Sequence, residues 1–413
     1  MQENIQFLTP EETCNYLRVN IRTVYRWAHM GLIPALRAGK QWRIRRSDVE
    51  AWLARKDASE RAKLEPLTDK IGAALGIGQI QTTLHNKINL YKKRAREVEN
   101  YLTKNPQEWG RFQSEFNSEV NGIFREIMNF EKSNLANGRS DRVDKLKRIF
   151  INRIRGLFMH KEYSAWSIGK PLGYAGDYKI IDKIYQNDPK TTGFDRLFDN
   201  YYQMSVISVG VRNRKEDFKR LITGFVDKRK NQKLRIMNLG SGSCREVKEL
   251  LSSRAIPGER VTFDCYDNDE RAIAFAKELL SGFKNINFYK ENALRLAAEK
   301  DIQSKIRERH DLIYSTGLFD YLANKTCVRL VKNLKLLLRN GSLIMISNVR
   351  DRYSNPSVHY MEWAGDWPLV YRDEDEFKKI FIEAGFKEDE LSVQYEQQGI
   401  MQYIIASNRI RHK

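Results

Sequence analysis

The chain has 413 residues, enough for two or three domains with cores of their own. Its 72 lysines and arginines outnumber 53 aspartates and glutamates, and the formal net charge of +19 favours polyanions without specifying DNA or RNA. Nothing near the N-terminus resembles a signal peptide, no apolar run approaches the roughly 20 residues that cross a bilayer, and the cysteines lack the spacing typical of a zinc site. We therefore expect a cytoplasmic protein with reduced thiols, no membrane span and no metal site.

The first 58 residues predict a small module of short helices and a hairpin. Thr9–Glu12 has the pattern of a capping box with proline at the first helical position, and this first helix should stop near Val19. A second helix is expected over Arg22–Met30, ended by a glycine. Ala35–Ile44 then reads as a hairpin, and a third helix follows. Two short helices joined by a tight turn are typical of a helix-turn-helix.

This module resembles the excisionase family of winged helix-turn-helix domains, which is close to the DNA-binding part of the MerR type. Five segments carry the likeness: Leu8–Glu12, Arg22–Trp27, Gly31–Pro34, Trp42–Ile44 and Asp48–Leu53. The resemblance implies that the second helix enters the major groove and that the hairpin forms a wing. The implied DNA-contacting residues are Arg22, Thr23, Tyr25 and Arg26 on the helix, and Arg37, Lys40 and Arg43 on the wing. A module that docks protein or dimerises is the alternative.

Residues 59–162 predict a helical connector, because apolar residues recur at helical spacing among lysines, arginines and glutamates. Within it, Lys92–Arg96 is a basic run that could extend a nucleic-acid path, although such runs more often mark a solvated helix face. Residues 163–232 predict a helical cap. Inside this cap, Gly169–Tyr178 is too rich in glycine and proline for a helix. It suits a loop that presents Tyr174 and Asp177 to a ligand, or a plain surface turn.

The C-terminal region, residues 233–413, predicts a parallel sheet with a ligand at one edge. Leu234–Met237 reads as a buried strand that runs into the glycine-rich turn Gly240–Ser243, and an amphipathic helix follows. A second strand, Val261–Tyr266, ends at Asp267. An acid about twenty-five residues beyond the glycines suits the paired hydroxyls of a ribose. The glycines alone would also fit a tight strand-to-helix turn.

Strands and helices continue to alternate after Asp267. Further strands are expected over Ile286–Tyr289, His310–Ser315, Leu343–Ser347, Leu391–Tyr395 and Met401–Ala406, with helices over Lys325–Leu338 and Glu374–Ala384. The last two strands are close enough to form an antiparallel hairpin. The predicted fold class is α/β. This order, with its final hairpin, resembles the Rossmann-like class I methyltransferases that use S-adenosylmethionine.

That resemblance implies a set of cofactor-binding residues. Those at the methionine end would be Leu239, Gly240, Ser241 and Gly242. Asp267 would hold the ribose beside Asn268, and Asn292 with Ala293 would lie by the adenine. The floor after the fourth strand would be formed by Ser315, Gly317 and Leu318. Asn238 departs from the pattern, because the family usually has an acid there. The ammonium group would then rely on backbone carbonyls or Asp177.

From roughly Glu162 to the C-terminus, the chain is similar to bacterial methyltransferases of the hydroxy-fatty-acid methyl ester biosynthesis type. The likeness is carried by Lys170-Pro171, Gly173–Tyr178, Ile184-Tyr185, Asn238–Gly242, Gly317–Tyr321, Glu362, Asp366–Leu369 and Tyr371-Arg372. It indicates family membership and leaves the substrate open. The excisionase-like module lies outside this pattern.

Methyl transfer from a sulfonium is an in-line displacement that mainly requires alignment of the acceptor and exclusion of water. A carboxylate acceptor needs no base, only a cation such as Arg372 or Arg350. An alcohol, amine or ring acceptor needs a base, for which Asp177 and Asp320 are candidates. The aromatic residues expected to steady the sulfonium, or else to be ordinary core, are Tyr174, Tyr178 and Tyr321.

The sequence thus predicts a methyltransferase that takes its methyl group from S-adenosylmethionine and methylates an oxygen of a small acid or hydroxylated molecule. The expected partners are that small-molecule acceptor, DNA at the N-terminal module, and a second copy of the chain in a homodimer. A nucleic-acid methyltransferase is one alternative, although Ser315–Leu318 stands where DNA amino-methylases carry Asp/Asn-Pro-Pro-Tyr. A transcription regulator that senses the cofactor is the other.

Overall fold

The structure is a computed structural model, and it describes residues 7–17, 24, 28, 33–38, 41–50, 78–158, 160 and 162–408. The N-terminal part forms a three-stranded antiparallel sheet in the order β1-β3-β2. Its elements are β1 (Phe7–Leu8), α1 (Pro10–Leu17), β2 (Leu36–Ala38) and β3 (Gln41–Arg45). Residues 46–50 are helical as well.

The predicted capping box at the start of α1 is present. The amide of Thr9 donates to Glu12 Oε2 at 2.8 Å, and the amide of Glu12 donates to Thr9 Oγ1 at 3.1 Å. The predicted hairpin is present too, with Leu36 opposite Arg43 and Arg37 opposite Trp42. A separate small core holds this module together, formed by Val24, Ala28, Ile33, Ile44 and Val49. Most of the predicted second helix, and the hairpin turn itself, lie outside the described residues.

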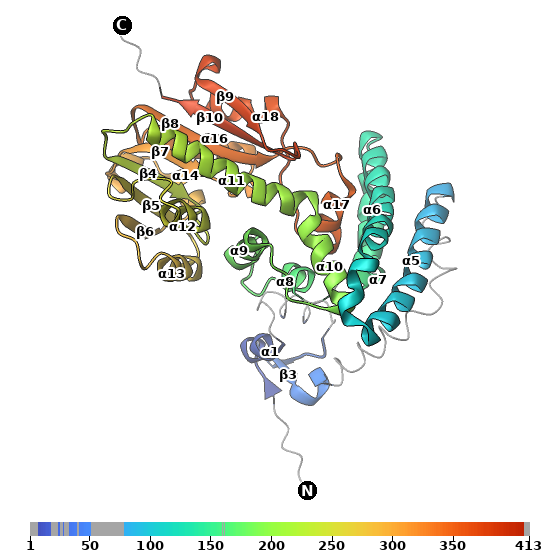
Figure 1. The fold of residues 1–413 in the computed structure, drawn as a ribbon. Coiled ribbons are helices and arrows are strands. Elements are labelled where there is room, and N and C mark those ends of the chain that lie inside the picture. Colours follow the sequence, from blue (N-terminus) through green and yellow to red (C-terminus); the bar gives the residue numbers. More distant parts are fainter. Residues whose placement is uncertain are drawn as a thin grey trace.

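Three long helices form the connector: α5 (Gly78–Lys104), α6 (Gln113–Ala136) and α7 (Ser140–Arg153). Figure 1 shows them side by side at one end of the molecule. They pack through an aromatic-rich face, in which Tyr91 stacks on Phe158 and Phe124 meets both Phe150 and Phe158 edge-on. Short 3-10 helices precede α6 and follow α7, over Pro106–Arg111 and Arg155–Phe158.

Four helices lead from the connector to the main sheet: α8 (Tyr163–Gly169), α9 (Tyr178–Gln186), α10 (Gly193–Met204) and α11 (Val206–Asp227). Residues 170–177 lie in no helix or strand. The glycine-rich segment is therefore a loop, as predicted. Helix α11 crosses one face of the sheet (Figure 1). Residues of α11, which belongs to the predicted cap, therefore lie at the edge of the sheet where the glycine-rich turn is found.

The main sheet has seven strands in the order β6-β5-β4-β7-β8-β10-β9. The first five are parallel, and β10 pairs antiparallel with both β8 and β9. The predicted α/β class and its C-terminal antiparallel hairpin are confirmed. The strands are β4 (Leu234–Leu239), β5 (Val261–Asp267), β6 (Ile286–Lys290), β7 (His310–Ser315), β8 (Leu338–Val349), β9 (Leu391–Tyr395) and β10 (Met401–Ser407).

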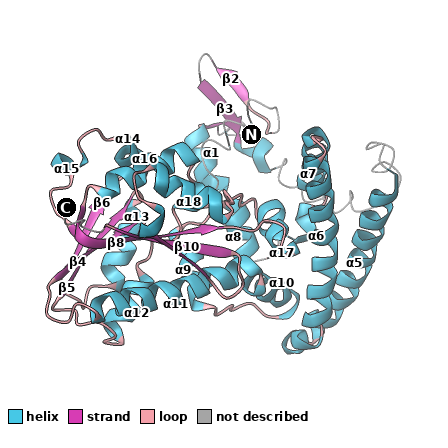
Figure 2. Ribbon diagram, turned by 90° about the horizontal axis from the view of Figure 1, so that it is seen from above, coloured by secondary structure: helices cyan, strands magenta, loops and turns pink. Residues whose placement is uncertain are grey.

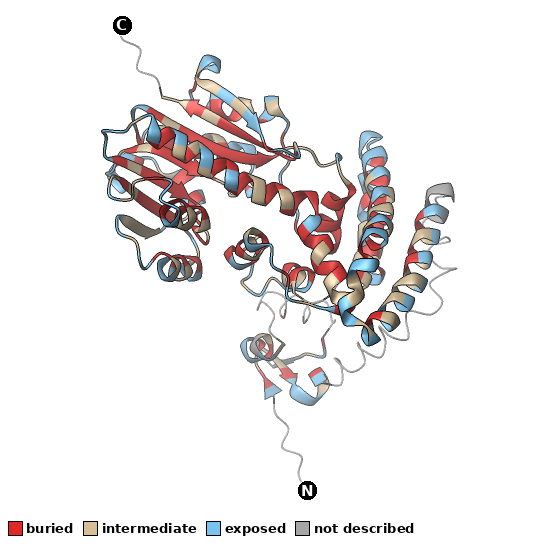
Figure 3. Cartoon of the chain, viewed as in Figure 1, coloured by how far each residue is buried: buried red, intermediate tan, exposed pale blue. Residues whose placement is uncertain are grey.

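Helices cover both faces of this sheet, with α11 and α12 on one side and α16 and α18 on the other (Figure 2). Alternate residues of each strand therefore enter different cores: Ile236 packs with the first group and Met237 with the second. The five inner strands are buried along most of their length, whereas the edge strands β6 and β9 are only partly covered (Figure 3). The helices are α12 (Arg245–Ser252), α13 (Glu270–Leu279), α14 (Ala293–Ala298), α15 (Ile302–Lys305), α16 (Asn324–Lys335), α17 (Pro356–His359) and α18 (Glu374–Glu383).

Two boundaries differ from the expectation. The helix predicted over Lys325–Leu338 ends at Lys335, and the fifth strand begins at Leu338 rather than Leu343. The reason is tertiary, because His310 of β7 pairs with Leu338 before an irregularity in the register. A 3-10 turn over Phe319–Tyr321 follows β7, a π-helical turn over Tyr360–Ala364 follows β8, and a 3-10 turn over Glu388–Glu390 precedes β9.

Candidate active site

The glycine-rich turn after β4 folds back on the end of β5. The amides of Gly240 and Ser241 both donate to the carbonyl of Tyr266, at 2.8 and 3.1 Å. Gly240 has a φ of +68°, and a Cβ there would stand 3.3 Å from the Cβ of Leu318. The turn therefore has no room for a side chain on the side that faces the end of β7.

Asp267 ends β5 with both carboxylate oxygens on backbone amides. Oδ2 accepts from Gly242 at 2.8 Å and Oδ1 accepts from Asp269 at 2.9 Å. Burial raises the pKa of Asp267, and these amide donors oppose that shift. A carboxylate oxygen can accept a second hydrogen bond. The side chain can therefore still bind the two hydroxyls of a ribose.

The residues predicted beside the nucleoside lie at the ends of neighbouring strands. Asn292 Nδ2 donates to Asn268 Oδ1 at 3.2 Å, which joins the ends of β6 and β5. Asn292 also caps α14, and Ala293 is the first residue of that helix. The next side chain, Leu294, is exposed. Parallel strands bring these positions to one edge of the sheet, where such folds bind ligands.

The turn after β7 lies next to the glycine-rich turn. Ser315 Oγ donates to the carbonyl of Leu239 at 2.7 Å. Leu318 packs against Gly240, and Gly317 faces the guanidinium of Arg214. The structure therefore brings the predicted floor residues next to the turn expected to hold the methionine end of the cofactor.

A buried acid that the sequence analysis missed lies beside Asn238. Glu246 of α12 accepts from Asn238 Nδ2 and from the hydroxyl of Tyr314, both at 2.8 Å. Burial raises its pKa, and these two hydrogen bonds act in the opposite direction. A carboxylate is thus present near the end of β4 although the strand itself carries an amide. Its position eight residues after Asn238 gave no sequence signal.

The loop over residues 170–177 is tied to two separate parts of the fold. On one side, the hydroxyl of Tyr174 donates to Asp269 Oδ2 at 3.1 Å, and Arg271 Nη2 donates to the carbonyl of Leu172 at 2.8 Å. On the other side, Lys170 Nζ lies 2.6 Å from Asp366 Oδ2. The loop therefore joins the helix after β5 to the segment after β8, and it lies over the edge that contains Asp267.

Within this loop, Asp177 acts as the N-cap of α9. Its Oδ1 accepts from the amides of Lys179 and Ile180, and its Oδ2 accepts from Trp166 Nε1 at 2.8 Å. The side chain is buried. Three donors within the cap thus bind this carboxylate, which gives Asp177 a structural role besides its predicted role as a base. Tyr178, the next residue, lies near Gly242.

Gly176 lies under two aromatic side chains. It has a φ of +68°, and a Cβ there would overlap the hydroxyl of Tyr321 and the ring of Trp367. Trp367 Nε1 donates to the Tyr321 hydroxyl at 2.7 Å, so that hydroxyl keeps its own proton for another acceptor. The side chain of Tyr321 is 42% exposed. A phenol hydroxyl thus lies beside the loop.

Asp320 and Arg372, both predicted to act on the acceptor, are buried in a network of internal contacts. Asp320 accepts from Arg214 Nη1 at 3.1 Å and from the amide of Val349 at 2.8 Å. Arg372 donates to the carbonyls of Phe319 and Leu322 and to the side chains of Asn324 and Asn348. Arg372 is only 1% exposed, so its donors are used in holding the turn after β7.

The other cation considered, Arg350, stacks over the ring of Tyr395 with its guanidinium carbon 4.7 Å from the centroid. In its place the structure brings Arg214 of α11 to the end of β7. Sequence reasoning missed Arg214 because it lies more than a hundred residues before Gly317, within a long helix that carries several other basic residues.

Comparison with known families decides the class of protein. Residues 146–406, more than half of the chain, match the family described as "Putative methyltransferase". The chain belongs to this family. The prediction of a methyltransferase is therefore confirmed. Residues 7–57 of this methyltransferase match the family described as "Helix-turn-helix domain", which confirms the predicted N-terminal helix-turn-helix.

Several solved structures are similar to this methyltransferase at low sequence identity. A possible exported protein from Bordetella parapertussis is 18% identical with a TM-score of 0.47, and the match covers 57% of this chain and 80% of that one. The CurJ carbon methyltransferase is 11% identical with a TM-score of 0.43, over 99% and 86% of the two chains. Magnesium protoporphyrin IX methyltransferase from Synechocystis, with bound S-adenosylmethionine, is 15% identical with a TM-score of 0.36, over 57% and 99%. A comparison with curated proteins found no match.

The predicted DNA-contacting residues of the methyltransferase are only partly described. Arg22, Thr23, Tyr25, Arg26 and Lys40 lie outside the described residues, as does the side chain of Arg37. Arg43 is on β3, where its Nη1 donates to the carbonyl of Trp42 at 3.0 Å. The groove contacts implied for this module remain a prediction.

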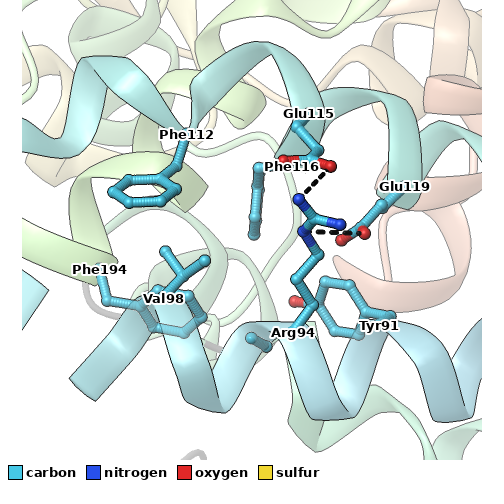
Figure 4. Close-up of a pocket in the computed structure, with 9 residues that line it drawn as sticks. Tyr91, Arg94, Val98, Phe112, Glu115, Phe116, Glu119 and Phe194 are labelled. Carbon is cyan, nitrogen blue, oxygen red and sulfur yellow. Dashed lines mark ion pairs between the residues drawn. The ribbon is translucent and has the colours of Figure 1, made fainter. Parts of the chain in front are cut away.

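A small pocket lies in the connector (Figure 4). It is lined by Tyr91, Arg94, Ala95, Val98, Phe112, Glu115, Phe116, Glu119 and Phe194. Arg94 reaches across it to Glu115 and lies 3.6 Å from Glu119. Among all the described residues, no group of three acidic, histidine or cysteine side chains is placed to hold a metal ion. None of the described helices is long and apolar enough to cross a membrane.

Proposed function

We propose that this methyltransferase transfers a methyl group from S-adenosylmethionine to an oxygen of a small acid or hydroxylated molecule. The observation that carries the proposal is the pairing of the glycine-rich turn with Asp267, through the 2.8 Å bond from the Gly242 amide. The turn has no side chain at Gly240 where the end of β7 approaches it. A carboxylate beside such a turn is suited to the ribose of a nucleoside ligand.

Residues at the ends of four strands would each bind a different part of the cofactor. Asp267 would accept hydrogen bonds from the ribose hydroxyls, with Asn268 beside it. Asn292 and Ala293 would lie by the adenine, and the turn Leu239–Gly242 would take the methionine end over Ser315, Gly317 and Leu318. Bound there, the cofactor would supply an electrophilic methyl group for in-line transfer to the acceptor oxygen.

The acceptor would lie between the 170–177 loop and the segment after β8. The loop excludes water from this edge through its contacts with Asp269 and Asp366. The free proton of the Tyr321 hydroxyl can be donated to an acceptor oxygen, which suits a carboxylate or a hydroxyl better than a protonated amine. A carboxylate acceptor needs no base, and this fits the use of Asp177 and Asp320 in internal hydrogen bonds. Hydroxy-fatty-acid methyl ester biosynthesis is the narrower assignment within this proposal.

A nucleic-acid acceptor is the second candidate, favoured by the helix-turn-helix match over residues 7–57 and by the net charge of +19. A regulator that senses the cofactor without turnover is the third. Label transfer from tritiated S-adenosylmethionine separates them. Label in a lipid or acid extract supports the first, label in nucleic acid supports the second, and none, with binding intact, supports the third. Absence of any heat with S-adenosylhomocysteine in calorimetry would contradict all three.

A further inference from the structure

Arg214 is a buried cation at the edge of the candidate active site. It lies on α11 and is 3% exposed, and its Nη1 donates to Asp320 Oδ2 at 3.1 Å. Its Nε is buried and has no hydrogen-bond partner among the described residues. A guanidinium carries five N–H donors; besides Asp320, Tyr185 forms a hydrogen bond with this one, and the Nε–H is left without an acceptor. Buried donors without acceptors are costly, which points to a missing partner.

The position of this guanidinium relates it to the methionine end of the proposed cofactor site. Arg214 Nη2 lies 3.3 Å from where a Cβ on Gly317 would stand. The neighbouring Leu318 packs against Gly240, so the turn after β7 lies against both the guanidinium and the glycine-rich turn. Gly317 has no side chain to cover the guanidinium on this side.

The charges around Arg214 favour an anion. The pair with Asp320 is joined by a second buried guanidinium, Arg372, which interacts with the same carboxylate electrostatically. These three groups together carry a net charge of +1. Glu246, another buried acid near the end of β4, accepts hydrogen bonds from Asn238 and Tyr314. A carboxylate ligand would balance the excess positive charge and accept the free N–H groups of Arg214.

We propose that Arg214 binds the α-carboxylate of the methionyl group of S-adenosylmethionine. This inference rests on the proposed function and names the residue that recognises one end of its cofactor. Arg214 would then select a cofactor that retains the carboxylate, while Asp320 fixes the guanidinium in position. A purely structural role, in which Arg214 only neutralises Asp320, is the competing explanation.

Calorimetry on the full chain with two ligands tests the proposal. S-adenosylmethionine has the carboxylate, and decarboxylated S-adenosylmethionine keeps the sulfonium and the amine but lacks it. The wild type should bind the former at least about 10-fold more tightly, as expected for a charged hydrogen-bonded pair. Arg214→Lys should lower the affinity for S-adenosylmethionine by about 10- to 100-fold, while the affinity for the decarboxylated ligand should change by less than about 2-fold.

Arg212→Lys is the matched control. Arg212 lies on the same helix, and both its contacts are with Gln203, at 2.7 and 2.8 Å. It should bind both ligands as the wild type does. If Arg214→Lys lowers the affinity for both ligands equally, or for neither, the inference about Arg214 is overturned while the proposed function stands. If that variant does not fold, equal affinity of the wild type for the two ligands overturns it. A wild type that binds neither ligand removes the proposed function as well.

Discussion

The backbone amide of Gly242 donates to Oδ2 of Asp267 at 2.8 Å. This bond joins the turn after β4 to the end of β5. The two strands themselves pair in parallel along the whole of β4. It fixes the carboxylate at the height of the turn, so that one ligand can touch both. The candidate site thus begins from a contact between the two features that stand out most clearly in the sequence.

Loss of the Asp267 carboxylate should remove nucleoside binding. Asp267→Ala eliminates the acceptor of the Gly242 amide and both proposed ribose contacts. The affinity for S-adenosylhomocysteine should fall on the order of 100-fold or more, and methyl transfer should disappear. Calorimetry and label transfer measure the two effects. Asp227→Ala, at an exposed position at the end of α11, is the control and should bind normally. Activity that survives Asp267→Ala would show that the cofactor site is elsewhere.

A side chain at position 176 should disturb the loop. Gly176→Ala places a methyl group against the Tyr321 hydroxyl and the Trp367 ring, at a φ of +68° that alanine disfavours. The free energy of unfolding should fall by about 1–3 kcal/mol, and methyl transfer should fall with it. Urea unfolding gives the first quantity. Gly282→Ala, where a Cβ meets nothing within 4 Å, should stay within about 0.5 kcal/mol of the wild type.

The buried carboxyl of Asp199 should make stability depend on pH. Burial raises its pKa to about 6, and the hydroxyl of Thr191 and the amide of Tyr163 partly oppose the shift. The folded state therefore holds this proton more tightly than the unfolded state, whose pKa is about 3.9. Stability is lost as the pH rises from about 4 to 6, by about 3 kcal/mol in total.

Asp199→Asn removes this titration. The variant should gain stability relative to the wild type between pH 4 and pH 7.5, as measured by urea unfolding at both values. Thr191→Val removes the 2.7 Å hydrogen bond to the carboxylate. Thr191→Val should therefore lower the free energy of unfolding more at pH 7.5 than at pH 4. A constant difference between Asp199→Asn and the wild type over this range would contradict the assignment.

Arg352 should be required to hold the connector against the segment after β8. It reaches Glu131 of α6 at 3.0 Å and donates through Nε to Glu362 of the π-helical turn at 2.9 Å. Both carboxylates are only 2% exposed. Arg352→Met leaves two buried acids without their shared cation and should destabilise the fold by about 3 kcal/mol at pH 7. Replacing Glu362 by Gln in the same chain should recover part of this loss, which a double-mutant cycle measures.

Sequence alone determined the features that depend on near neighbours. The α/β alternation, the capping box at Thr9, the glycine-rich turn and the acid at Asp267 follow from apolar periodicity and from a few residues at short spacing. The helix boundary at Lys335 was missed, because the pairing of His310 with Leu338 extends β8 beyond what local propensity indicates.

Only the tertiary structure decided which charged groups meet at the end of β7. Arg372, a candidate for the acceptor site in the sequence, uses its donors inside the fold, whereas Arg214 comes from a distant helix with a donor left over. Glu246 similarly reaches Asn238 from the next helix. A long charged side chain has no periodic signal, and its partner is set by how helices pack on the sheet. That packing depends on contacts between residues far apart in the chain.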